Sequence, residues 1–358
     1  MEKRGRLFGL VVLGAFFWFL ASTGEAATID VTCPGQSLQT NGINAAASSG
    51  DTIRVSGTCI ENVVVNKSVI IDGSGIPSTG TPTAEIHATD AGTPTVKITS
   101  GGVTIRNFRS IQQGQDGIVV STTGPTIFNN TIQNNTRDGI LVLSGTNPII
   151  NDNTIQTNTR NGVTVYANSF ATIINNDITN NSGDGIAVTE NSAARIGFSS
   201  GSETTASPNT ITSNGGNGIN VNQSSNARIV GNTISDNTGF GIRVYQLSHA
   251  QISSNTIDNN GTITASSGIW LSGGCGVELG SASGSSIFEL PNNTAVNNGG
   301  FGINFGAGAY VTGRIGTLNG VNGPIGNSNI GITISTLAGD SGIDVNGNMN
   351  ITGTIIIR

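Results

Sequence analysis

Phe128–Val163 reads FNNTIQNNTRDGILVLSGTNPIINDNTIQTNTRNGV, in which one short unit occurs twice at a spacing of 23 residues. The unit combines an Asn-Thr-Ile triplet, a second asparagine three residues beyond the isoleucine, and a glycine followed by Ile or Val. Between the glycine and the next triplet lies another apolar pair, Ile149-Ile150. A fixed period divided into three short β-branched runs indicates a protein of stacked repeats.

The unit recurs along most of the chain. Its glycines follow one another at spacings of 22, 23, 23, 33, 23, 27 and 34 residues, and the asparagines share the 33-residue step. The glycines are Gly117, Gly139, Gly162, Gly185, Gly218, Gly241, Gly268 and Gly302, and the asparagine pairs include Asn130 and Asn135, Asn153 and Asn158, Asn176 and Asn181, Asn209 and Asn214, Asn232 and Asn237, and Asn255 and Asn260. The longer coils place extra loops at Arg195–Pro208, Gly273–Pro291 and Gly306–Gly326, beside which we expect any specific site.

The apolar runs favour strands over helices. Three or four β-branched residues in a row, broken by Asn and Gly, do not sustain a 3.6-residue pattern. If each coil lays its three strands beside those of the next, Ile118 and Val120 point inward and Val119 points outward. The sequence therefore predicts an all-β solenoid with coils of 22 or 23 residues and a dry aliphatic interior.

The asparagine columns fit the turns of such a solenoid. Asparagine tolerates the left-handed backbone of a sharp turn, and its amide both donates to and accepts from an identical residue one coil away. Asn129-Asn130-Thr131 also has the pattern of a glycosylation acceptor. We prefer a hydrogen-bonded ladder because the asparagine spacing follows the coil.

The first 26 residues have the pattern of a secretory signal peptide. Lys3, Arg4 and Arg6 precede an apolar run over Leu7–Ala21, and small residues lead to a candidate cleavage site after Ala26. The apolar run is too short for a membrane span. We expect an exported protein, located outside the cell, on its surface or in a periplasm, without a membrane span in the mature chain; an uncleaved anchor is the alternative.

Composition excludes two classes of protein. The formal net charge of −6 offers no basic footprint for nucleic acid, so no nucleic-acid partner is expected. Although 52 residues are glycine, Ile and Val recur throughout and only 9 residues are proline, which is unlike a disordered linker.

The chain has three cysteines, and disulfides persist in exported proteins. Cys33 and Cys59 both lie near the start of the mature chain, so we pair them and leave Cys275 as a buried or free thiol. Other pairings stay open at this point.

The glycine and asparagine columns over Thr95–Phe305 resemble the right-handed parallel β-helix repeat proteins of the pectate-lyase-like superfamily. The resemblance implies a single-stranded right-handed parallel β-helix, with a short helix over Gln36–Ala47 that caps the amino-terminal end. After the predicted signal peptide (1–26), it divides the chain into a cap with the first coils (27–75) and the β-helix proper (76–358). The motifs are specific for the fold and poor for function.

Enzymes of this superfamily place their functional residues on the outer face of one sheet, which directs attention to the outward columns after each glycine. Arg243 and Trp270 fall in one column, close enough for cation–π contact or for the guanidinium to meet a uronate carboxylate. Tyr166 and Tyr245 fall in the next column, and flat outward rings suit sugar stacking. Alternatively, these rings shelter a turn or an oligomer contact.

A third column, just before the glycine, contains Asp116, Asp138 and Asp184. Carboxylates one or two coils apart suit hydrolysis or calcium binding, but Asp-Gly is also ordinary turn chemistry, which we favour. His87 and His249 lack neighbours at metal-ligand spacing. We therefore expect no cofactor and no metal site, with calcium as the weaker alternative.

Two functions remain open. The first is a noncatalytic exported module that presents a shallow face to polysaccharide or another surface component, with Val119, Leu141 and Leu143 as exposed contact residues. The second is a polysaccharide lyase or glycoside hydrolase with a divergent site at Arg243 and Asp184, although the paired-Asp, Gly-His-Gly, Arg-x-Lys and Arg-rich motifs of the superfamily's enzymes are absent from the sequence.

Overall fold

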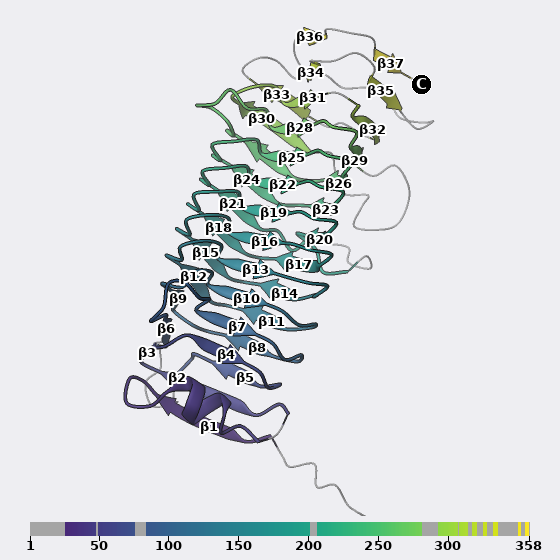
Figure 1. Cartoon of the computed structure of the whole chain (residues 1–358). Coiled ribbons are helices and arrows are strands. Elements are labelled where there is room, and N and C mark those ends of the chain that lie inside the picture. Colours follow the sequence, from purple (N-terminus) through teal and green to yellow (C-terminus); the bar gives the residue numbers. More distant parts are fainter. Residues whose placement is uncertain are drawn as a thin grey trace, which may run out of the picture.

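The computed structural model describes residues 26–47, 49–75, 84–200, 206–280, 293–306 and 308–313, together with strands β33–β37 at the carboxyl-terminal end. These residues form one stack of coils that runs from the purple amino-terminal end to the yellow carboxyl-terminal end (Figure 1). The predicted signal peptide lies outside the described residues, except for Ala26, as do parts of the three longer loops. Among the described residues, no helix is both long and apolar enough to cross a bilayer.

Each coil contributes one strand to each of three parallel sheets, which we call A, B and C. Sheet A consists of β1 (Thr28–Thr32), β2 (Thr52–Ser56), β5 (Ile70–Asp72), β8 (Thr104–Arg106), β11 (Thr126–Phe128), β14 (Ile149–Asn151), β17 (Phe170–Ile174), β20 (Ala193–Ile196), β23 (Asn226–Val230), β26 (His249–Ser253), β29 (Gly276–Leu279), β32 (Tyr310–Gly313), β35 (Ile332–Ser335) and β37 (Ile355–Ile357).

Sheet B follows sheet A along each coil. It consists of β3 (Thr58–Ile60), β6 (Glu85–His87), β9 (Ser110–Gln112), β12 (Thr131–Gln133), β15 (Thr154–Gln156), β18 (Asp177–Thr179), β21 (Thr210–Thr212), β24 (Thr233–Ser235), β27 (Thr256–Asp258), β30 (Thr294–Asn298) and β33 (Thr317–Gly320).

Sheet C holds the strands that follow the repeated glycine. It consists of β4 (Val63–Val65), β7 (Val96–Ile98), β10 (Ile118–Val120), β13 (Ile140–Val142), β16 (Val163–Val165), β19 (Ile186–Val188), β22 (Ile219–Val221), β25 (Ile242–Val244), β28 (Ile269–Leu271), β31 (Ile303–Phe305), β34 (Ile325–Asn327) and β36 (Asn350–Ile351). The predicted three-stranded coil is confirmed.

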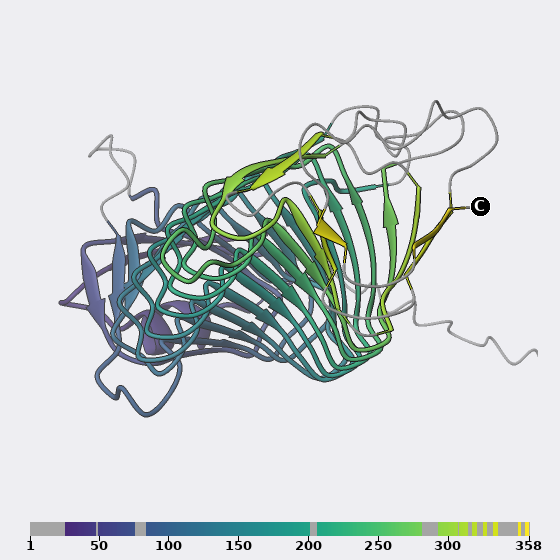
Figure 2. The ribbon, with the colours of Figure 1, turned by 90° about the horizontal axis from the view of Figure 1, so that it is seen from above.

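The coils stack in strict register. Ile118 pairs with Ile140 and, in the same strands, Val120 pairs with Val142. These inward side chains are fully buried, as are the matching residues of sheets A and B, and together they fill a continuous aliphatic core. In Figure 2 successive coils lie over one another along this core. Because equivalent residues meet at every step, each aliphatic side chain packs on its own counterpart.

The repeated glycine stands where the fold leaves no space for a side chain. A Cβ on Gly139 would lie 2.5 Å from Cγ2 of Ile155 and 2.7 Å from the carbonyl oxygen of Gly162. The glycines of neighbouring coils have the same surroundings, so any side chain there would collide with both the core and the next coil. Tight packing at this corner therefore explains why the repeat has a glycine before each sheet C strand.

Both asparagine columns form buried ladders, as predicted. Asn130 donates its Nδ2 to Oδ1 of Asn153 over 3.1 Å, and Asn153 donates to Asn176 over 3.0 Å. The second column repeats the pattern from Asn135 to Asn158 over 2.9 Å. Asn130 is only 2% exposed, so its amide belongs to the ladder. The acceptor of the Asn129-Asn130-Thr131 pattern is Asn129, which is exposed and donates its Nδ2 to Asn107 Oδ1 over 2.8 Å, so glycosylation there stays untested.

The amino-terminal end is closed by a short π-helix, η1 (Leu38–Ile43), which lies within the predicted cap. Its first and last residues, Leu38 and Ile43, are fully buried. The Glu61 carboxylate accepts hydrogen bonds from the backbone N–H groups of Leu38 and Gln39, which holds the helix on the first coil. Beside it, Cys33 and Cys59 form the predicted disulfide.

Cys275 is the free cysteine of the described chain, and it is fully buried immediately before β29. Burial raises the pKa of its thiol to about 11. The thiol is therefore protonated and unreactive at neutral pH.

Candidate functional site

The outward residues of sheet C form a row that follows the solenoid axis, which we call the outer row. Register places Asn220 beside Arg243, Arg243 beside Trp270, and Trp270 beside Asn304. Toward the amino terminus the row continues through Ala187, Thr164, Leu141 and Val119. The predicted column is therefore present.

The prediction that Val119, Leu141 and Leu143 are exposed contact residues is wrong. Val119 is 4% exposed, Leu141 is 8% exposed, and Leu143 is half-buried. They point outward, but register places Val119 between Lys97 and Leu141, and Leu141 between Val119 and Thr164, so residues of the neighbouring coils enclose them. The contact of Asn161 with the Thr164 hydroxyl, 3.0 Å, shows how closely a flanking side chain approaches the row.

Arg243 is the centre of a group of aromatic rings, the Arg243 cluster, which also contains Phe240, Tyr245 and Trp270. The Arg243 guanidinium carbon lies 4.0 Å from the Tyr245 ring centroid and 4.9 Å from that of Trp270. Phe240 and Trp270 stack with centroids 5.3 Å apart. All four side chains are partly exposed, so the cluster presents flat rings and a cation at the surface.

Polar atoms along the same face are enclosed without hydrogen-bond partners among the described residues. They are Nε of Arg243 and the Oδ1 atoms of Asn220, Asn222 and Asn304. An enclosed polar atom without a partner destabilises a fold by about 1–3 kcal/mol, so several in one place are unusual outside functional sites. Three of the four are acceptors, which suits a ligand rich in hydroxyl donors.

The aspartate column is a third ladder. Asp116 Oδ1 accepts from the backbone N–H of Asp138 over 3.1 Å, and Asp138 Oδ1 accepts from that of Asn161 over 3.0 Å. Farther along, Asp184 accepts from the side chains of Asn217 and Asn220, over 2.7 Å and 2.8 Å. These carboxylates therefore fix the turns before the glycines, and calcium binding by this column stays a prediction.

Burial raises the pKa of both Asp116 and Asp138, although Arg137 and Arg160 lie within about 4 Å and oppose the shift. For a carboxyl whose pKa is raised on folding, stability is greatest below the unfolded pKa of about 3.9 and falls as the pH rises through the folded pKa. Both carboxyls therefore cost stability at neutral pH.

We expect Asp138→Asn to raise the free energy of unfolding by about 1 kcal/mol at pH 7. The amide keeps the acceptor for Asn161 and removes a buried charge whose Oδ2 has no partner. Chemical denaturation at pH 7 and near pH 4 checks this, because the gain should shrink as the wild-type carboxyl is protonated. Asp152→Asn, on an exposed turn, makes the same charge change and should have little effect; a destabilised Asp138→Asn protein would contradict the prediction.

The structure brings together only some of the residues singled out in the sequence. Arg243, Tyr245 and Trp270 meet, and Asp184 reaches the cluster through Asn220. Tyr166 occupies the position equivalent to Tyr245 three coils earlier, about 14 Å away. Asp116 and Asp138 lie farther still along the ladder. Whether these residues bind a ligand stays a prediction.

Sequence reasoning missed Phe240 as a member of the cluster. Phe240 stands immediately before Gly241, where earlier coils have aspartate or asparagine, and its backbone N–H still donates to Asn217 Oδ1 over 3.0 Å. The sequence did contain a signal for Phe240, because an aromatic residue there replaces the aspartate or asparagine of the earlier coils. The outer face of sheet A was missed as well, and it is described below.

The family model of the right-handed β-helix region matches residues 36–196 and 188–317, and the chain therefore belongs to this family. Together with the parallel solenoid, this confirms the resemblance to the pectate-lyase-like superfamily. A comparison with curated proteins finds no match.

Three solved structures are similar to this chain at low sequence identity. The catalytic domain of a GH87 α-1,3-glucanase in complex with tetrasaccharides is 15% identical with a TM-score of 0.50, over 88% of this chain and 64% of that chain. The A-module of the Azotobacter vinelandii mannuronan C-5 epimerase AlgE4 is 14% identical with a TM-score of 0.43, over 87% and 83%. An alginate lyase from Paenibacillus is 14% identical with a TM-score of 0.39, over 85% and 98%.

Proposed function

We propose that this chain is an exported, noncatalytic module that binds polysaccharide at the Arg243 cluster. The observation that carries the proposal is the guanidinium of Arg243 among three partly exposed rings, of which Trp270 shares the outer row and Phe240 and Tyr245 flank it. Sugar rings stack on flat aromatic faces, and a guanidinium pairs with carboxylates and hydroxyls. The glucanase of the same fold, solved with tetrasaccharides, agrees with a saccharide ligand.

Export is supported by two features. The Cys33–Cys59 disulfide is a bond that persists in oxidising compartments, and the first 26 residues have the pattern of a secretory leader. A protein of this kind meets polysaccharides outside the cytoplasm, which fits the proposed ligand.

The geometry around Arg243 favours binding over cleavage. The carboxylate nearest in the column is Asp184, and both of its oxygens already accept hydrogen bonds from Asn217 and Asn220. Hydrolysis by paired carboxylates needs an acid and a base on opposite sides of the scissile bond. Asp184 instead accepts hydrogen bonds that fix the turn before Gly185, so we assign it a positioning role.

The test is a binding assay with Trp270→Ala and Arg243→Ala. Loss of ring stacking or of the cation should weaken binding to an oligouronate about tenfold or more. Titration calorimetry of the folded variants against hexagalacturonate measures this. Tyr166→Ala removes an equally placed ring outside the cluster and should bind like the wild type. Unsaturated products or new reducing ends that disappear in Arg243→Ala or Asp184→Ala would overturn the noncatalytic assignment in favour of a lyase or hydrolase.

A further inference from the structure

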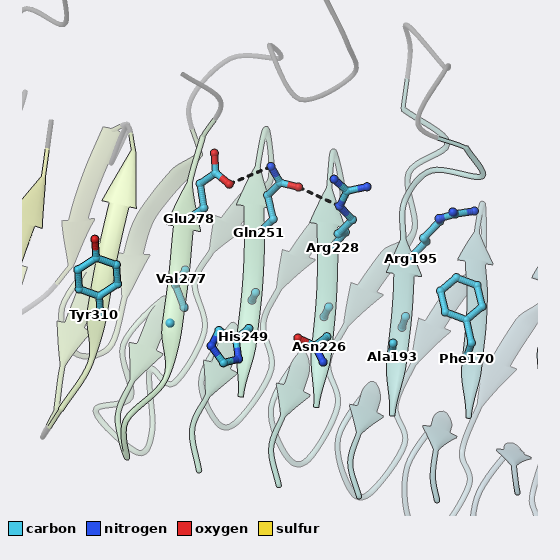
Figure 3. A pocket seen from close by; sticks show the side chains of 14 residues that line it. Phe170, Ala193, Arg195, Asn226, Arg228, His249, Gln251, Val277, Glu278 and Tyr310 are labelled. Atoms are coloured by element: carbon cyan, nitrogen blue, oxygen red, sulfur yellow. Dashed lines mark hydrogen bonds between the residues drawn. The ribbon is translucent and has the colours of Figure 1, made fainter. Parts of the chain in front are cut away.

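The outer face of sheet A carries a groove that the Arg243 cluster does not use. It extends across six neighbouring strands, from β17 to β32, which corresponds to about 24 Å along the solenoid axis. Its volume is about 710 Å³. Figure 3 shows the Phe170 ring at one end and the Tyr310 ring at the other, with smaller side chains between them.

Two rows of outward side chains form the groove. The first row, set by strand register, is Phe170, Ala193, Asn226, His249, Gly276 and Tyr310. Small residues in this row leave space between the two rings. The absence of a side chain at Gly276 leaves this space to the His249 ring, because a Cβ there would lie 2.8 Å from its Cδ2. The imidazole therefore extends over the glycine and lines the groove.

The second row is polar and carries a gradient of charge. Its members are Arg195, Arg228, Gln251 and Glu278 in adjacent strands. Arg228 donates its Nε to Gln251 Oε1 over 3.0 Å, and Gln251 donates to Glu278 Oε2 over 3.2 Å (Figure 3). The Arg195 guanidinium lies 5.4 Å from the Phe170 ring centroid. The end near Phe170 is therefore cationic, and the end near Glu278 is anionic.

We propose that this groove, here called the sheet A groove, is a second saccharide site that takes an extended uronate-containing segment along the solenoid axis. Carboxylates of the segment pair with Arg195 and Arg228, and a sugar ring at the other end stacks on Tyr310, in the strand next to that of Glu278. This inference extends the proposed function, because a chain with saccharide sites on two different sheets links two polysaccharide strands.

The face of a sheet suits a saccharide better than a peptide. The backbone N–H and C=O groups of β20, β23 and β26 pair with neighbouring coils, so no main-chain donors remain for an added strand. A saccharide needs only side-chain partners and rings, and the coil spacing of about 4.8 Å presents a new set of side chains at regular steps. The two cations of the second row favour a ligand that carries carboxylates at their end of the groove.

The experiment uses the full mature chain with hexagalacturonate and its carboxyl-reduced form in titration calorimetry. Ala193→Leu fills the groove from an outward, half-buried position, and Arg228→Ala removes a cation. Each should abolish groove binding or weaken it about tenfold or more, and the carboxyl-reduced hexasaccharide should bind the wild-type groove about tenfold more weakly. Thr126→Leu adds similar bulk on sheet A outside the groove and should bind like the wild type.

The two sites are separated by combining variants. Trp270→Ala should leave binding that is still sensitive to Ala193→Leu, whereas the double variant should bind no saccharide. If the cluster does not bind, Trp270→Ala will have no effect while Ala193→Leu removes all binding, which retains the groove and rejects the proposed function. If Ala193→Leu and Arg228→Ala both bind as the wild type does, the groove is not a saccharide site. Binding of an acidic peptide in preference to the hexasaccharide would equally reject it.

Discussion

Replacing Asn214 by alanine is expected to lower the free energy of unfolding by about 4 kcal/mol. Asn214 is fully buried between β21 and β22, in the middle of the second asparagine ladder. Its Oδ1 accepts from both the backbone and the side chain of Asn181, and its Nδ2 donates to Ile178 and to Asn237. Alanine removes these bonds and leaves buried groups in two neighbouring coils without partners.

Chemical denaturation followed by circular dichroism measures this loss. Asn226→Ala, at an exposed position on β23, is the matched control and should change stability by less than about 0.5 kcal/mol. Hydrogen exchange should show lost protection in the coils on both sides of Asn214, because solenoid coils are stabilised mainly by their neighbours. Equal stability of the two variants would mean that the ladder contributes little.

The fold was predictable because every coil repeats the same physical requirement. A residue that faces the core or a tight turn in one coil has the same surroundings in the next, so columns such as Gly117, Gly139 and Gly162 appear directly in the sequence. The contact between Arg243 and Trp270 was predictable for the same reason, since both stand two residues after a column glycine.

The exposure of an outward residue was not predictable from the alternation of inward and outward side chains along a strand. Strand periodicity fixes the direction of Val119 and Leu141, but it does not reveal that they are 4% and 8% exposed in the assembled stack. Exposure depends on strand length and on the curvature of the turns, which are properties of the assembled coil.

The sheet A groove was missed for a different reason. Its rows contain Ala193, Asn226 and His249, which share no chemical type, so no column stands out. The signal was available in the spacing, because Arg195, Arg228 and Gln251 follow one another at the same 33- and 23-residue steps as the glycines. Outward rows can therefore be assembled from the register of the inward ones.

Replacing Gly218 by alanine tests the space argument for the glycine column. A Cβ there would lie 2.4 Å from Cγ2 of Ile234 and 2.6 Å from the backbone carbonyl oxygen of Gly241. Real Cβ atoms do not approach so closely, and the Gly241 carbonyl is already fixed by the hydrogen bond that it accepts from the backbone N–H of Ile219 over 2.9 Å. The coils must separate locally, so we expect a loss of about 3 kcal/mol or more in the free energy of unfolding.

A matched glycine distinguishes crowding from backbone strain. Gly124 has a φ of +75°, and a Cβ on this residue would meet no atom within 4 Å. Gly124→Ala therefore tests backbone strain without crowding, and it should lower the free energy of unfolding by only about 1 kcal/mol. Thermal and denaturant unfolding of the two variants compares them directly. If Gly218→Ala is no more destabilising than Gly124→Ala, neighbouring coils have space for a methyl group at the glycine column. The explanation of this column by close packing is then wrong.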